Sequence, residues 1–133
     1  MVMSETNLRV ALDSHLLTMT GSPPVDWEGV FFDPINTIYL SQSLLPAETI
    51  TVGQEAGGAD VLAGVYQITV NIPKGTKRND WLVELERVKA RFVRNTILIE
   101  SGTRVVITKV WSSSLMTSGA YSLVPISIRY RAV

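Results

Sequence analysis

The sequence predicts an α+β domain in which two helices pack on a mixed, largely antiparallel sheet. The first observation is a strand at residues 65–72, where apolar and polar side chains alternate with period two. Its apolar positions are Tyr66, Ile68, Val70 and Ile72. The second is a helix at residues 80–94, whose apolar side chains recur at helical spacing. The third is the order of helix, strands, helix and strands along the chain, which is typical of α+β domains.

The strand and the helix that follows it are expected to pack against each other. Pro73-Lys74-Gly75 ends the strand, because proline cannot donate to the ladder and glycine permits a sharp turn. The apolar stripe of the helix consists of Trp81, Leu85, Val88 and Phe92. Acidic residues lie toward the start of this helix and basic residues toward its end, as the helix macrodipole favours. The strand has one apolar face and the helix has one apolar stripe, and the two are expected to pack together. This packing would form the centre of the fold.

The remaining strands and the first helix are predicted from the same two patterns, alternation in strands and helical spacing of apolar residues. Residues 5–19 are expected to form the first helix, with Leu8, Leu12 and Met19 on one face. The other strands are expected at residues 25–32, 38–45, 49–52, 104–111 and 120–131. Pro125 inside the last strand predicts an edge position or a bulge, because proline has no N–H group for the ladder.

Length and composition indicate one domain, residues 1–133, and exclude several functional classes. Twelve basic and twelve acidic residues cancel, which argues against a general nucleic-acid or membrane-surface binder and leaves self-association unopposed. The absence of cysteine excludes disulfides, zinc–cysteine sites and cysteine nucleophiles. The N-terminal residues lack the apolar core of a signal peptide. No run of about 18 apolar residues predicts a membrane span.

No group of residues in the sequence fits a catalytic or metal-binding template. Asp13-Ser14-His15 contains the residue types of a serine triad, but consecutive helical residues do not face each other. Asp26 and Glu28 share one face of a predicted strand, where solvated charges are favoured over a working carboxylate pair. One histidine and scattered acidic residues give no metal-ligand spacing. We therefore expect no catalytic residue, cofactor or metal.

Two further segments show a weak similarity to phosphate-binding sites. Residues 53–58 read G-x-x-x-G-G, but they lack the Lys-Ser or Lys-Thr of a phosphate loop and precede a strand. Lys74, Lys77 and Arg78 form a basic turn, to which the second helix adds four basic residues. A solvated turn and a dipole-matched helix end are the favoured interpretation of this charge.

Several short motifs follow one another in a fairly specific order and span nearly the whole chain. They are Trp27-Glu28-Gly29-Val30-Phe31-Phe32-Asp33-Pro34, Tyr39-Leu40, Leu44-Leu45-Pro46-Ala47, Gly64-Val65-Tyr66-Gln67-Ile68, Pro73-Lys74-Gly75, Phe92 with Thr96 beyond it, and Pro125-Ile126-Ser127-Ile128-Arg129-Tyr130-Arg131. Their order resembles that in the tail-terminator-like proteins of long-tailed bacteriophages and prophages. Lys77-Arg78-Asn79-Asp80 departs from the pattern, because a run rich in glycine and alanine is expected there.

The resemblance implies a structural virion protein of the tail or neck, assembled in the bacterial host cytoplasm, and no enzyme. Such a protein forms a ring, of six copies by the resemblance, that caps the tail tube, ends its polymerisation and offers a docking face to the head. Its implied partners are other copies of itself, the tail tube protein and the head connector protein, with no membrane and no sequence-specific nucleic acid. The alternatives are a head–tail joining protein of the neck and a small nucleic-acid-binding module that uses residues 74–78 and the second helix.

Two polar segments, residues 54–60 and 112–119, are expected to be long mobile loops, and such loops are often binding surfaces. Residues 54–63 include an apolar pair with no evident place in the core. We expect this segment to order against a neighbouring subunit. The interface residues of this hypothesis are Gln54, Glu55, Gly57, Gly58, Val61 and Leu62.

Overall fold

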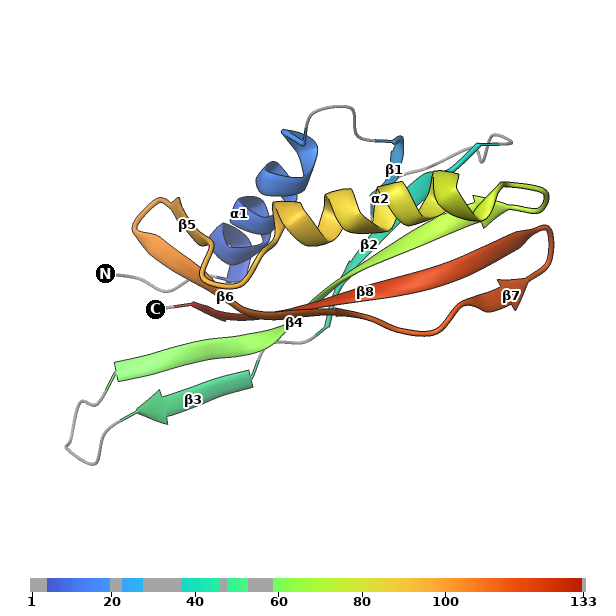
Figure 1. Ribbon diagram of the computed structural model, residues 1–133. Helices are drawn as coiled ribbons and strands as arrows, with labels where there is room; N and C mark the ends of the chain where they lie inside the picture. The colour runs from blue at the N-terminus through green and yellow to red at the C-terminus, as the bar shows by residue number, and fades with distance from the viewer. Residues whose placement is uncertain (1–4, 20–22, 28–36, 46–47, 53–58, 133) are drawn as a thin grey trace.

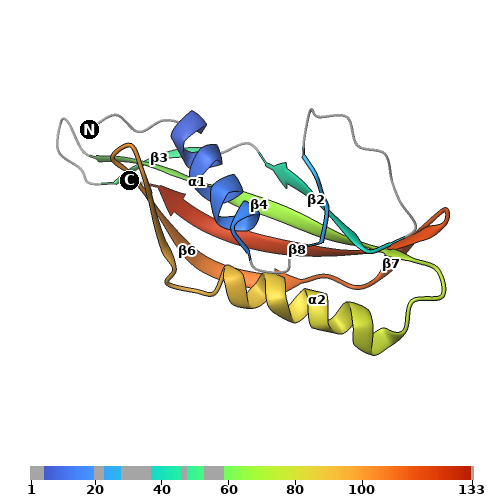
Figure 2. The ribbon, with the colours of Figure 1, turned by 90° about the horizontal axis from the view of Figure 1, so that it is seen from above.

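The computed structural model describes residues 5–19, 23–27, 37–45, 48–52 and 59–132. Two helices cover one face of a curled, mostly antiparallel sheet, and neither of these described helices lies on the other face (Figure 1). Viewed from above, α1 crosses the strands and α2 runs along the sheet at an angle to it (Figure 2). The predicted fold class, with two helices on a mixed, largely antiparallel sheet, is confirmed.

The helices are α1 and α2, and the described strands form one sheet. Their bounds are α1 Glu5–Leu17, β1 Val25–Asp26, β2 Tyr39–Leu44, β3 Glu48–Val52, β4 Ala59–Pro73, α2 Arg78–Arg91, β5 Ile97–Glu100, β6 Thr103–Ser112, β7 Met116–Ser118 and β8 Tyr121–Ala132. The strand order is β1-β2-β4-β8-β6-β5, while β3 adds to β4 and β7 adds to β8. Among the described strands only β1 and β2 pair in parallel.

The core lies between the helices and the two long central strands, β4 and β8. The four apolar positions predicted for residues 65–72 are buried, and Leu85, Val88 and Phe92 are buried above the sheet. Trp81, at the start of the same stripe, is only partly buried. The alternation of β4 and the stripe of α2 therefore give the predicted central sandwich.

Helix α2 ends three residues earlier than predicted, at Arg91. Phe92 caps the helix, and its N–H still donates to the Val88 carbonyl at 3.2 Å. Asn95 has a positive φ of 73° and donates its N–H to the Ile107 carbonyl at 2.8 Å. The chain thus leaves the helix because a left-handed residue and a bond to β6 turn it toward the sheet.

Strand β8 is central, between β4 and β6, so the predicted edge position of Pro125 is wrong. The carbonyl of Pro125 accepts a hydrogen bond from the Ser113 N–H at 2.9 Å. Its missing N–H therefore faces the interval between β6, whose pairing ends at Ser112, and β7, whose pairing begins at Met116. Proline is tolerated in this central strand because the neighbouring ladder is interrupted there.

The structure corrects two predicted segments and adds one strand. The second expected loop, residues 112–119, contains β7, which pairs with β8. The strand expected at residues 25–32 is reduced in its described part to β1, since Trp27 lies beyond the strand. Strand β5, which the sequence reading did not assign, is fixed by its pairing with β6. The rest of residues 25–32, including Glu28, lies outside the described residues.

Candidate functional site

The predicted interface segment belongs in part to a β-hairpin arm, formed by β3 and residues 59–63 of β4. Glu48 pairs with Ala63 at the root of this arm, and Val52 pairs with Ala59 toward its tip. The ladder between β4 and β8 starts only at Leu62. Among the described strands, residues 59–61 therefore pair with β3 alone. Figure 1 shows the arm projecting from one end of the sheet, away from the helices.

The structure corrects the expectation of a loop over residues 54–63 in its described part, residues 59–63. Val61 and Leu62 lie in β4, opposite Ile50 and Thr49 of β3, so the backbone here is paired in the isolated subunit. The other interface candidates, Gln54, Glu55, Gly57 and Gly58, lie outside the described residues, as does Gly53 of the glycine pattern. A contact of these six candidates with a neighbouring subunit stays a prediction.

The residues of the triad-like sequence contact separate structural partners. The Tyr66 hydroxyl donates to Asp13 Oδ1 at 2.6 Å, and His15 Nε2 donates to the backbone carbonyl of Arg91 at 2.6 Å. Burial lowers the pKa of His15, the bond to the Arg91 carbonyl opposes this shift, and the charge of Arg91 adds to it. Asp13 and His15 thus connect α1 to β4 and α2 and do not form a relay.

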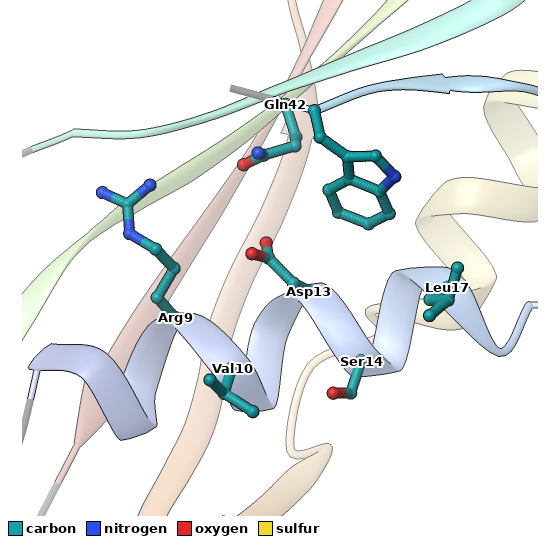
Figure 3. A pocket seen from close by; sticks show the side chains of 7 residues that line it. Arg9, Val10, Asp13, Ser14, Leu17 and Gln42 are labelled. Carbon is teal, nitrogen blue, oxygen red and sulfur yellow. The ribbon is translucent and has the colours of Figure 1, made fainter. Parts of the chain in front are cut away.

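A pocket of about 380 Å³ lies between α1 and β2, beside Asp13 and Ser14. It is lined by Arg9, Val10, Asp13, Ser14, Leu17, Trp27 and Gln42. Figure 3 shows Asp13 from α1 and Gln42 from β2 pointing into the space between the two elements. Exposed Val10 and Leu17 border an open mouth. Arg9, Asp13, Ser14 and Gln42 give this open hollow polar groups, although the carboxylate of Asp13 already accepts the Tyr66 hydroxyl.

The basic residues that the nucleic-acid hypothesis uses are partly engaged within the subunit. Lys74, Lys77 and Arg78 are exposed at the turn before α2. Within α2, however, Arg87 forms an ion pair with Glu84 at 3.1 Å, and Arg91 donates to the His15 carbonyl at 2.9 Å. These contacts weaken the case for a continuous phosphate-binding face along the helix.

A cationic patch on the helix-free face of the sheet was not anticipated from the sequence. We call Lys109, Trp111, Arg129 and Arg131 the open-face patch. Arg129 and Arg131 are exposed and alternate with buried residues of β8. In β6 the register shifts between Ile107 and Lys109, so that Thr108 is an extra residue. This bulge places Lys109 opposite Arg129 and Trp111 opposite Ser127, on the open face.

Two cations of the open-face patch, Lys109 and Arg129, lie near the indole ring of Trp111. Lys109 Nζ lies 5.2 Å from the ring centroid and Arg129 Cζ lies 5.6 Å from it. Both distances allow cation–π attraction. The signal in the sequence is the spacing of the basic residues in β6 and β8. It predicts a shared face only when the bulge, which reverses the alternation of β6 after Ile107, is known.

Within the described ranges, no group of three or more histidine, cysteine, aspartate or glutamate residues is placed to hold a metal ion. Neither described helix is long and apolar enough to cross a membrane.

Comparison with known proteins identifies a family and a similar solved structure. The sequence profile of the phage tail terminator protein family matches residues 7–130. One solved structure is similar over 99% of this chain and 97% of its own, with 27% sequence identity and a TM-score of 0.78. No curated protein matches the chain.

Proposed function

The chain belongs to the phage tail terminator family, and we propose that it acts as a ring that caps the tail tube and ends tube polymerisation. As a member of this family it is a structural component of the phage tail and not an enzyme. The observation that carries the proposal is the family match over nearly the whole described fold, residues 7–130. The proposed ring has six copies, and its outer face docks the head connector protein.

The arm supports this proposal because it gives the subunit a projecting element suited to contact a neighbour. A closed ring uses head-to-tail contacts between two different surface patches. The paired backbone of residues 59–61 extends beyond β8, where a neighbouring chain has access to it. In this proposal the six interface candidates, from Gln54 to Leu62, lie in the subunit contact, and main-chain pairing with a neighbour's sheet edge adds to it.

The test is to add purified protein to preassembled tail tubes together with free tube protein, and to image the tubes by negative-stain electron microscopy. We expect ring-shaped density at one tube end and constant tube length. Tubes that continue to elongate with bare ends would overturn the terminator role. Binding to the isolated head connector but not to tubes would assign the chain to the neck instead.

A further inference from the structure

Charge is divided unevenly along this neutral chain. Residues 1–73 contain one basic residue, Arg9, and eight acidic residues, a net charge of −7. Residues 74–133 contain eleven basic and four acidic residues, a net charge of +7. The arm lies in the acidic part, with Glu48 in β3 and Asp60 in β4. No lysine or arginine occurs between Arg9 and Lys74, so the arm itself contains no basic residue.

The open-face patch lies in the basic part and places like charges opposite each other. Lys109 and Arg129 are directly opposite each other on β6 and β8, and like charges at such positions destabilise a sheet. No carboxylate whose side chain the structure describes forms an ion pair with Lys109, Arg129 or Arg131. Trp111 holds two of these cations over its ring but neutralises neither.

We propose that the arm of one subunit docks on the open-face patch of the next subunit, so that the head-to-tail contact joins an acidic element to a basic sheet face. The inference rests on the proposed ring and names its two contacting surfaces. Complementary charge explains how a chain of zero net charge selects a head-to-tail contact over a symmetric one, because arm against arm or patch against patch places like charges together.

The same observations favour a second copy of the chain over a nucleic acid as the occupant of the patch. Arg131 is directly opposite Ala63, and Ala63 is in turn opposite Glu48 at the root of the arm. A polyanion on the patch would therefore lie beside the subunit's own acidic arm and be repelled by it. An arm from a neighbouring subunit brings only a few negative charges to the same place.

The proposal is tested by charge reversal in the full-length protein. The patch variant carries Lys109→Glu and Arg129→Glu, and the arm variant carries Glu48→Lys and Asp60→Lys. The control variant carries Lys74→Glu and Lys77→Glu, which are exposed at the turn before α2 and change the net charge as much as the patch variant does. Thermal unfolding of each variant verifies that it folds before its capping activity is measured by imaging of tail tubes.

We expect the control variant to cap tubes like the wild type. The patch and arm variants should each need at least about tenfold more protein for half-maximal capping, because like charges across a contact weaken it strongly. An equal mixture of the two variants should restore capping, since an alternating ring again places opposite charges at every contact. Wild-type capping by either variant alone, or a mixture as poor as its components, would overturn the proposal.

Two measurements distinguish this contact from the proposed function and from nucleic-acid binding. If the wild type leaves tubes uncapped, the capping role fails and the contact is judged by sedimentation of the concentrated protein. If each variant alone fails to associate and their mixture associates, the contact is supported. If the wild-type protein does not associate, the proposal is overturned. Loss of DNA binding in the patch variant with wild-type capping would show that the patch serves nucleic acid, which also overturns the proposal.

Discussion

His15 and Arg91 each donate a hydrogen bond to the other's backbone carbonyl, and this exchange joins the C-terminal ends of the two helices. His15 Nε2 lies 2.6 Å from the Arg91 oxygen, and Arg91 Nε lies 2.9 Å from the His15 oxygen. Arg91 also donates to the Thr18 hydroxyl at 2.6 Å. Carbonyl groups at helix ends have no partner within the helix, so these side chains satisfy groups that would otherwise need water.

The first prediction concerns pH. Because burial lowers the pKa of His15 in the folded state, the unfolded chain binds more protons just below the ordinary histidine pKa of about 6.5. The free energy of unfolding should therefore be highest above this pH and fall as the pH drops from 7.5 toward 5.5. Urea unfolding at a series of pH values measures this slope.

The matched control for this pH dependence is His15→Gln, whose side chain retains an N–H donor but does not titrate. His15 is the single histidine of the chain, so the variant should lose most of the slope between pH 7.5 and 5.5. An unchanged slope in the variant would show that carboxylates, and not His15, set the pH dependence.

The second prediction concerns the bond between α1 and β4. Tyr66→Phe removes a hydroxyl that donates to the Asp13 carboxylate at 2.6 Å, while the buried ring remains. Hydrogen bonds to charged groups contribute about 1.5–3 kcal/mol, and we expect a loss of unfolding free energy in this range. Asp13→Ala should cost less in the Tyr66→Phe background than in the wild type, and strictly additive losses in this double-mutant cycle would contradict the coupling.

The third prediction concerns Phe92, which fills the space between the helices and the sheet. Its ring lies edge-on to His15, with centroids 4.9 Å apart, and 6.0 Å from the ring of Tyr66. Phe92→Ala should lower the unfolding free energy by roughly 3–5 kcal/mol, because it empties a fully buried aromatic site. The adjacent Val93 is 55% exposed, and Val93→Ala should cost no more than about 0.5 kcal/mol. A loss below 1 kcal/mol for Phe92→Ala, by chemical denaturation, would contradict this packing.

The fourth prediction concerns hydrogen exchange along β4. Residues 66–71 pair with β2 on one side and β8 on the other, whereas residues 59–61 pair with β3 alone among the described strands. In the free subunit the amides of residues 59–61 should exchange faster, because fewer contacts oppose local opening. On tail tubes they should become protected if the arm enters a subunit contact. Equal exchange in the free and assembled forms would exclude the arm from that contact.

Much of the architecture could be predicted because it depends on local patterns. The alternation from Tyr66 to Ile72 and the stripe from Leu85 to Phe92 each define one apolar face, and such faces must pack together. The order of short motifs also identified the family, which the match over residues 7–130 confirms. Both inferences use residues that are close in sequence or fixed in order.

Features that depend on pairing between distant strands were decided only by the tertiary structure. Pro125 suggested an edge position or a bulge, but β8 is central and tolerates the proline because the neighbouring ladder is interrupted between β6 and β7. Residues 59–63 were expected in a loop, but their backbone groups are satisfied by β3. The bulge at Thr108 turns Lys109 and Trp111 to the open face. A local period shows that a strand has two faces; strand order, bulges and register, which arise from long-range hydrogen bonding, determine which side chains meet there.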